Sequence, residues 1–304
     1  KAKLAVESEG AICIFLDGFD APMIIRKRDG AFLYATTDIA TIEYRVQHFA
    51  PDVILYVVDH RQSEHFAKLF AAARAIGYEQ LELHHISFGT VLGSDGKPFQ
   101  TRSGTVIGLD YLLDEAVERA YQAVCDPQRL QKAGLQMSEE ERREIANTVG
   151  LGAIKYADLS HNRTSDYEFN TEKMVQLEGN TSAYIQYMVA RSRSIIRKSE
   201  VQVDASTIGK FTICLEEPAE RNLALQLLQF EDALRQSVDE YYPSVLAGYL
   251  YAVAKQFAAF FDQCHVLNAE RDEIRNSRLA LCYAVDRVLK QGLELLGIGV
   301  VERM

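Results

Sequence analysis

A phenol, a carboxylate and an amide lie in the first third of the sequence at positions from which they could share one binding site. Tyr34 and Asp38 come at the end of a short apolar run, and Gln62 follows a longer apolar run. If both runs are parallel strands, ligands bind beyond their carboxyl ends. Asp38 can accept two parallel N–H bonds from a guanidinium, while a phenol or amide fixes its plane. The alternative is that Asp38 only caps a helix and Tyr34 only packs.

The elements that would position these residues follow a β-α-β-α-β order. Residues 1–28 are expected to form short strands. Thr36, Thr37 and Asp38 are expected to cap the helix that follows the first parallel strand. The expected series is strand 31–34, a helix ended by Pro51, strand 53–58 buried on both faces, helix 64–76 ended by Gly77, and strand 81–86. This order predicts right-handed crossovers and a doubly wound parallel sheet.

Beyond residue 108 the pattern is helical. A capping box is expected at Ser138, and a linker is expected over 201–218. The expected helices are 109–124, one that opens after Ser138, and three amphipathic helices at roughly 219–240, 244–262 and 274–296, the last capped by Gly297. The fold class is therefore α/β followed by an all-α bundle.

A basic, glycine-containing loop separates these two halves. Lys97 and Arg102 could place positive charge against phosphates. A simple hairpin turn over 94–97 is the alternative. The adjacent pair His84 and His85 does not form a metal site, because neighbouring side chains on a strand point to opposite faces. For His84, the main alternative to a place in a binding site is a position in the core, with its ring nitrogens hydrogen-bonded.

One strongly basic stretch lies in the second half, over residues 184–198. Tyr184, Tyr187 and Arg191 share one helical face, which suits phosphates and unstacked bases. The cations of this stretch are Arg191, Arg193, Arg197 and Lys198. Taken alone, the stretch favours a solvated basic helix over an RNA-binding one.

Composition is that of a soluble protein with two domains. The chain has 304 residues, 48% of them hydrophobic and 25% charged, and a formal net charge of -10. The acidic balance argues against nucleic acid unless a basic face is local. Five scattered cysteines argue against a zinc site and a disulfide framework, and favour the cytoplasm. No apolar run approaches the length of about 18 residues that a membrane helix needs.

Several short motifs occur in order along the chain. Those in the first half are Tyr34-Ala-Thr-Thr-Asp38, Asp59-His-Arg-Gln62 and Lys97-Pro-Phe-Gln-Thr-Arg-Ser-Gly104. Those in the second half are Gly179-Asn-Thr-Ser-Ala-Tyr-Ile-Gln-Tyr187, Asp232-Ala-Leu-Arg235 and the final Glu302-Arg-Met304. Taken in this order, the motifs resemble the arginyl-tRNA synthetases, a class I aminoacyl-tRNA synthetase family, and the resemblance runs along the whole chain.

The resemblance implies a domain order and a set of site residues. Residues 1–118 would be the second half of the catalytic Rossmann domain with loop 97–104, 119–174 a helical connection, and 175–304 the anticodon-binding domain. The implied site residues are Tyr34, Asp38 and Gln62 for arginine; His85, Gly89 and Val91 for ATP; Lys97, Thr101 and Arg102 for catalysis; and Tyr184, Tyr187, Arg191, Arg193, Arg197 and Lys198 for tRNA. Gln100 departs from the family, because many relatives have lysine there and one phosphate contact would be lost. Asp232 and Arg235 could be purely structural.

The resemblance also implies the reaction. An enzyme of this family uses ATP with Mg²⁺ to form an arginyl-adenylate and passes the arginyl group to the 3′-terminal ribose of arginine tRNA. Such catalysis depends on positioning and on charge stabilisation, without a covalent enzyme intermediate. The implied partners are therefore L-arginine, ATP and arginine tRNA, with no structural metal and no membrane. The sequence does not fix the oligomeric state, and a monomer is expected.

One family signature is missing from the sequence. No His-x-Gly-His tetrapeptide occurs, and the chain opens on Lys1 rather than methionine. We therefore expect the carboxy-terminal portion of such an enzyme, inactive in adenylate formation on its own. The alternative is a stand-alone RNA-binding or regulatory module derived from a synthetase.

Overall fold

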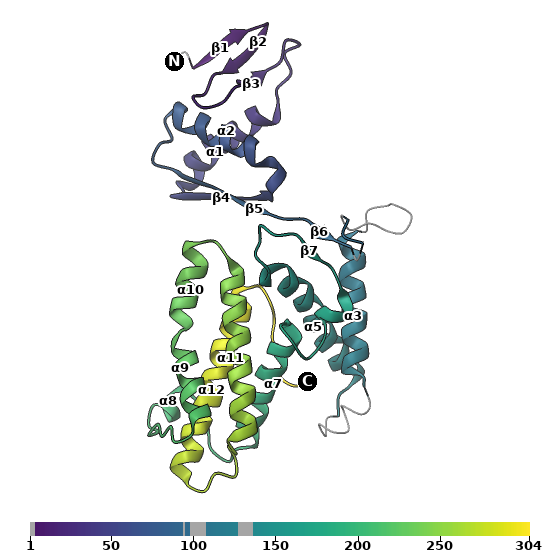
Figure 1. Ribbon diagram of the computed structural model, residues 1–304, viewed down its shortest axis with the longest axis vertical. Coiled ribbons are helices and arrows are strands. Elements are labelled where there is room, and N and C mark those ends of the chain that lie inside the picture. Colours follow the sequence, from purple (N-terminus) through teal and green to yellow (C-terminus); the bar gives the residue numbers. More distant parts are fainter. Residues whose placement is uncertain (1–3, 94, 98–107, 127–135) are drawn as a thin grey trace. The chain divides into compact units, whose positions relative to one another are not determined.

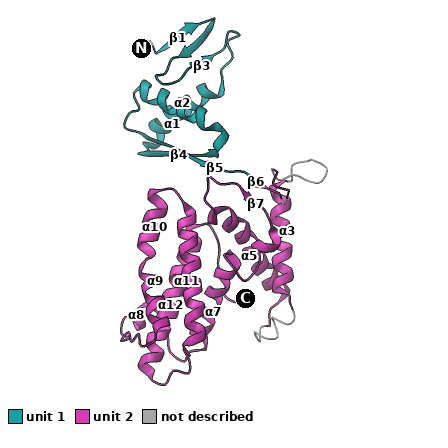
Figure 2. Ribbon diagram, in the orientation of Figure 1, with its two compact units in different colours: residues 1–90 teal, residues 91–304 magenta. Residues whose placement is uncertain are grey.

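The computed structural model describes residues 4–93, 95–97, 108–126 and 136–304. The chain divides into two compact units, residues 1–90 and residues 91–304 (Figures 1 and 2). The first unit has its own hydrophobic core around Ile42 and Leu69. The second unit has a larger core around Leu250 and Leu289.

The first unit opens with a three-stranded antiparallel sheet. Its strands are β1 (Ala5–Ser8), β2 (Ala11–Ile14) and β3 (Met23–Arg26), with β2 in the middle. Ile14 and Met23 are buried in the core of this unit. The short strands predicted for residues 1–28 are confirmed.

A parallel pair of strands follows. β4 (Val53–Asp59) pairs in register with β5 (Glu82–Phe88). The connection consists of the 3-10 helix η1 (His60–Gln62) and α2 (Ser63–Ile76), which ends at Gly77 with a positive φ of 115°. Helix α1 (Tyr34–Phe49) contacts α2, and both helices lie on the same side of the strands (Figure 1). The predicted strand-helix-strand order over residues 53–86 is confirmed.

The predicted strand over residues 31–34 is wrong. Phe32 makes a single antiparallel bridge to Arg26, and Tyr34 is already the first residue of α1. A turn causes this difference: the N–H of Gly30 bonds to the carbonyl of Lys27, at 3.0 Å, and sends the chain back against β3. The segment therefore belongs to the edge of the antiparallel sheet.

The predicted capping of α1 is also wrong. Leu33 is the N-cap residue and supplies no side-chain cap, so Thr36, Thr37 and Asp38 lie inside the first turns. The Oγ1 of Thr37 donates to the carbonyl of Leu33, at 3.2 Å, while Thr36 donates to the carbonyl of Ile25 in β3. Asp38 is therefore not needed to start the helix.

One face of the β4–β5 pair is open in the described part of the first unit. Val53, Leu55 and Val57 alternate along β4 and are exposed, Val57 by 66%. The prediction that this strand is buried on both faces is therefore wrong for this chain, because α1 and α2 cover only the face that carries Tyr56 and Val58. Parallel strands are normally covered on both faces.

The second unit begins with β6 (Val91–Leu92), which pairs in parallel with β7 (Tyr167–Glu168). Helices α3 (Leu109–Val124) and α5 (Glu139–Ser160) pack against each other, and the short α6 (Thr171–Met174) contacts both. The capping box predicted at Ser138 is confirmed, since its Oγ accepts the N–H of Glu141, at 3.2 Å, and its own N–H bonds back to Glu141.

The remainder of this unit is a helical bundle. Its members are α7 (Ser182–Lys198), α8 (Ala205–Ile208), α9 (Pro218–Leu228), α10 (Phe230–Asp239), α11 (Pro243–Gln263) and α12 (Asp272–Leu295). Helix α11 contacts α5, α7, α9, α10 and α12 and is the centre of the bundle (Figure 1). Gly297, with a φ of 70°, follows the end of α12 as predicted.

Helix α11 is long and apolar enough to cross a membrane by length and composition alone. It is nevertheless a core helix of the bundle, because Leu250, Val253 and Phe257 are completely buried between neighbouring helices. Core helices of soluble proteins meet the same two criteria. We therefore infer no membrane span from it.

The single helix predicted over 219–240 is wrong, because it is broken into α9 and α10 at Gln229. The end of α9 leaves carbonyls without helical partners. The Tyr249 hydroxyl of α11 donates to two of them, at 3.0 Å from Gln226 and 3.2 Å from Leu227. A tertiary hydrogen bond thus stabilises a break that helical periodicity alone does not reveal.

Replacing two helical glycines by alanine should have opposite effects on stability. A methyl group on Gly150 of α5 would lie 2.6 Å from the Cα of Val117 in α3, whereas one on Gly248 of α11 would meet nothing within 4 Å. Gly150→Ala should therefore lower the free energy of unfolding by roughly 1–3 kcal/mol or more. Gly248→Ala should raise it by about 0.5–1 kcal/mol. Urea denaturation followed by circular dichroism measures both. Equal effects of the two substitutions would contradict the close α3–α5 approach.

Candidate functional site

The carboxylate of Asp38 lies between the two helices of the first unit. Asp38 is in the second turn of α1, and its Oδ2 lies 2.7 Å from the Nε2 of His65 in the first turn of α2. Both side chains are about one-third exposed, at 36% for Asp38 and 30% for His65. The carboxylate is therefore hydrogen-bonded and still reachable from solvent.

The other two residues predicted for an arginine site lie at the starts of the same helices. Tyr34 begins α1 one turn before Asp38 and is 86% exposed. Gln62 ends η1, serves as the N-cap residue of α2 and is exposed, three residues before His65. Residues three and four apart on a helix lie on one face. Tyr34 and Asp38 therefore lie in the first two turns of α1, and Gln62 lies at the start of α2, three residues after the end of β4.

An aromatic side chain lies near Asp38, and a cation lies against its ring. Burial raises the pKa of Tyr56 in β4, Arg45 lowers it, and the negative charge of Asp38 raises it further. The guanidinium of Arg45 lies 5.5 Å from the centre of the Tyr56 ring. Tyr56 is therefore a neutral phenol at neutral pH. The sequence-based prediction of this site missed Tyr56, Arg45 and His65.

The residues predicted to lie beside the adenine are divided between the two units. His85 is on β5, where its Nε2 lies 3.0 Å from the carbonyl of Val58 and its ring 4.7 Å from that of Phe66. Gly89 follows β5 directly, whereas Val91 begins β6 in the second unit. His84 has its Nε2 3.3 Å from a carboxylate oxygen of Glu82, which is consistent with the predicted opposite orientation of the two histidines.

Part of the predicted phosphate loop is described. The N–H of Gly93 bonds to the carbonyl of Lys97, at 2.8 Å, and the N–H of Lys97 bonds to Asp95. Lys97 is exposed at the end of this tight turn. Thr101, Arg102 and Gln100 lie outside the described residues.

The predicted RNA-facing stretch is helix α7, and its aromatic residues face α11. The guanidinium of Arg191 lies 5.2 Å from the ring centre of Tyr187 and 4.2 Å from that of Phe261. Tyr184 meets Tyr251 edge to face at 5.9 Å, and Lys255 lies 5.7 Å from the Tyr251 ring. We call the six residues the α7–α11 aromatic face: Tyr184, Tyr187, Arg191, Tyr251, Lys255 and Phe261. The sequence analysis missed its α11 members.

Two of the predicted tRNA-binding arginines bond to other parts of the fold, Arg193 in a largely buried position and Arg197 at the surface. Arg193 is only 13% exposed, with its Nε 2.6 Å from Asp286 of α12 and its Nη1 2.5 Å from Glu302. Arg197 donates to the carbonyl of Glu302 at 3.0 Å. These bonds hold the final residues of the chain against α7. Lys198, in contrast, is exposed at the end of the helix.

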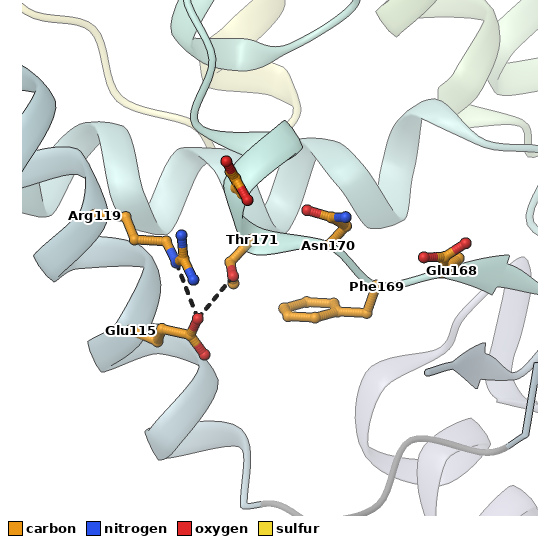
Figure 3. A pocket seen from close by; sticks show the side chains of 7 residues that line it. Glu115, Arg119, Glu168, Phe169, Asn170 and Thr171 are labelled. Carbon is orange, nitrogen blue, oxygen red and sulfur yellow. Dashed lines mark hydrogen bonds and ion pairs between the residues drawn. The ribbon is translucent and has the colours of Figure 1, made fainter. Parts of the chain in front are cut away.

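A pocket of about 260 Å³ lies in the second unit, among α3, β7 and α6 (Figure 3). Its lining consists of Glu115, Arg119, Glu168, Phe169, Asn170, Thr171 and Glu172. Glu115 pairs with Arg119 at 2.9 Å and accepts the Thr171 hydroxyl at 2.8 Å (Figure 3). These three groups satisfy one another, so the pocket needs no ligand to balance them. In the described part of the chain, no group of three or more His, Cys, Asp or Glu side chains could hold a metal ion.

The class of protein is defined by two family matches. Residues 1–171 match the family described as "tRNA synthetases class I (R), catalytic domain", and residues 185–304 match the "DALR anticodon binding domain". The chain therefore belongs to the arginyl-tRNA synthetases of class I. The resemblance read from the short motifs is confirmed.

Curated relatives agree with the family matches. The chain is 52% identical to the arginine–tRNA ligase of Rhodopirellula baltica over 99% of this chain, and 45% identical to that of Shigella dysenteriae over 100% of this chain. It covers 46% and 53% of those two proteins. The chain thus spans about half the length of the curated relatives it matches.

Solved structures support the fold of the whole chain. The arginyl-tRNA synthetase of Plasmodium falciparum matches all of it with a TM-score of 0.83 at 29% identity, and 50% of that protein is covered. The enzyme of Thermus thermophilus matches 99% of this chain with a TM-score of 0.82 at 27% identity, with 56% of that protein covered. The predicted fold class, a class I catalytic part followed by a helical anticodon-binding domain, is confirmed.

Proposed function

We propose that this chain supplies the arginine-selecting and tRNA-binding parts of an arginine–tRNA ligase. The observation that carries the proposal is the Asp38 carboxylate, held at the edge of α1 and α2 with about one-third of its side chain exposed. A partly buried carboxylate is the group expected to bind a guanidinium. The names of the curated relatives support the same substrate.

We propose the following roles within the arginine site. Asp38 accepts the guanidinium N–H groups. Tyr34, one helical turn before Asp38, and Gln62, one helical turn before His65, fix the plane of the guanidinium. The carboxylate of arginine then attacks the α-phosphorus of ATP, supplied as its Mg²⁺ complex, and pyrophosphate leaves. His85, Gly89 and Val91 contact the adenine, and Lys97, Thr101 and Arg102 stabilise charge on the phosphates.

We propose that the second step uses the other unit to hold the tRNA. The 3′-terminal ribose hydroxyl attacks the arginyl carbonyl, and AMP leaves. The α7–α11 aromatic face offers rings for unstacked bases, with Arg191 and Lys255 beside them for phosphates. The protein would act as a monomer in the cytoplasm. Arg193 contributes mainly to folding, because Asp286 and Glu302 already bind its guanidinium.

Charge reversal at Lys255 of the α7–α11 aromatic face and at Lys198, two helical turns after Arg191 on α7, should weaken tRNA binding. Lys198 and Lys255 are both exposed, so Lys198→Glu with Lys255→Glu leaves the bundle intact. We expect the affinity of the chain for arginine tRNA to fall on the order of tenfold at low salt. The salt slope, which is the slope of the logarithm of the binding constant against the logarithm of the salt concentration, should become shallower by about 2. Filter binding at several salt concentrations measures both quantities.

The matched control reverses two exposed lysines elsewhere, Lys27 and Lys210. It changes the net charge equally and should keep the salt slope. Equal losses in the two double variants would mean that only net charge matters, and the aromatic face would then not be the RNA surface.

Charging of tRNA tests the proposed function itself. The longest natural protein that contains this sequence should attach radiolabelled arginine to arginine tRNA in the presence of ATP and Mg²⁺. A stand-alone RNA-binding module would bind the tRNA and form no arginyl ester. That outcome would replace the proposed ligase with the alternative.

A further inference from the structure

His65 makes the contact that fixes the carboxylate of Asp38. Its Nε2 lies 2.7 Å from the Oδ2 of Asp38, and its ring packs edge to face on Phe66 at 5.2 Å. Phe66 is buried in the core of the first unit, so the histidine ring is supported from below. His65 comes from α2 and Asp38 from α1, so the contact also joins the two helices that carry the candidate arginine site.

The direction of the hydrogen bond follows from the chemistry of its partners. An ionised carboxylate can only accept hydrogen bonds, so the Nε2 of His65 must carry the hydrogen. The bond uses one lone pair of Oδ2. A carboxylate has about four lone-pair positions, so Asp38 keeps acceptors for the two parallel N–H groups of a guanidinium.

We propose that His65 is a positioning residue of the arginine site, which holds the Asp38 carboxylate at one rotation so that its remaining lone pairs face the guanidinium. The inference rests on the proposed function, because it assigns His65 a role toward the ligand of Asp38. Without this donor the carboxylate rotates about its terminal bond and is solvated from several directions. Binding arginine would then have to order it again.

The cost of that ordering sets the expected effect. Immobilising one additional side chain on binding weakens affinity by roughly threefold to tenfold. His65→Ala should therefore raise the KM for arginine by about that factor. The kcat for adenylate formation should stay within about twofold, because the histidine does not touch the reacting atoms.

Substitution by glutamine separates positioning from simple packing. The Nε2 amide of glutamine can occupy the place of the histidine Nε2, so His65→Gln keeps the donor. We expect it to restore the arginine KM to within about twofold of the natural value. His48 provides the control, because it is an exposed histidine of α1 whose Nδ1 lies 2.8 Å from the Tyr44 carbonyl. His48→Ala should leave KM and kcat unchanged.

The experiment is arginine-dependent ATP–pyrophosphate exchange, with tRNA present, on the longest natural protein that contains this chain. His65→Ala, His65→Gln, His48→Ala and Asp38→Asn are compared in parallel. A raised KM in His65→Ala with recovery in His65→Gln is the expected result. An unchanged KM in His65→Ala overturns the inference, as does a lowered KM, which would mean that His65 competes with arginine for Asp38.

The Asp38→Asn variant keeps the two claims apart. If Asp38→Asn raises the arginine KM while His65→Ala does not, the arginine site stands and the role of His65 fails. If Asp38→Asn changes neither KM nor kcat, the arginine site itself is wrong. Should His65→Ala fail to fold, His65→Gln decides alone: a KM near the natural value supports the inference, and a raised KM overturns it.

Discussion

We expect the replacement of Asp38 by asparagine to raise the arginine KM roughly tenfold to a hundredfold. The substitution keeps the shape of the side chain and removes the negative charge. A charge-assisted hydrogen bond is worth roughly 1.5–3 kcal/mol, so its loss accounts for that factor. Arginine-dependent ATP–pyrophosphate exchange measures the KM, and tRNA affinity should not change, because the proposed RNA face belongs to the second unit.

Asp239 provides the matched control for this prediction. It is an exposed aspartate at the end of α10, in the other unit. Asp239→Asn removes the same charge and should leave the arginine KM unchanged. If Asp38→Asn behaves like the control in both KM and kcat, Asp38 serves only the packing of α1 against α2.

Removing the carboxylate of Glu220 should be the most destabilising of the substitutions considered. Glu220 of α9 is completely buried, and its Oε1 lies 2.6 Å from the Nε of Arg278, which is itself only 12% exposed. Its Oε2 accepts the N–H of Glu217, at 2.9 Å, at the start of the helix. Glu220→Ala leaves a buried guanidinium without its counter-ion, which costs about 3–5 kcal/mol. For a unit of this size, the melting temperature should fall on the order of 10 °C.

The exposed ion pair of Glu231 with Arg235 is the control for the buried one. Its N–O distance is a similar 2.8 Å, but the two side chains are 74% and 73% exposed. Water and salt screen such a pair, so Glu231→Ala should hardly move the melting curve. Similar losses in the two variants would mean that burial of the Glu220–Arg278 pair does not determine its effect.

Local patterns predicted the elements that depend on local chemistry. Ser138 and Glu141 cap one helix through residues three apart, and the β-branched run over 53–58 forms a parallel strand. Helix α3 begins and ends at the predicted residues 109 and 124. In each case the residues that decide the structure are neighbours in the chain.

Predictions failed where distant residues decide the structure. The break at Gln229 depends on the Tyr249 hydroxyl, and the use of Arg193 inside the fold depends on Asp286 and Glu302. The sequence placed Arg193 among phosphate contacts because a cation on a basic helix carries no sign of its ion-pair partners. These partners lie tens of residues away and meet only in the folded bundle.

The predicted site shows the same division. Motif resemblance assigned Asp38 and Gln62 to the proposed arginine site, but it missed His65, although His65 follows Gln62 by one helical turn. The signal was available in that spacing, since residues three apart on a helix share a face. Tyr56 carried no comparable signal, because its place beside Asp38 depends on how α1 packs against β4.

A structure with L-arginine bound, solved for the longest natural protein that contains this sequence, tests the arginine site most directly. We predict that the guanidinium lies within hydrogen-bond distance of both carboxylate oxygens of Asp38, with Tyr34 and Gln62 against its plane and His65 still bonded to Oδ2. Arginine bound elsewhere, with Asp38 in contact only with His65, would contradict the assignment of this site.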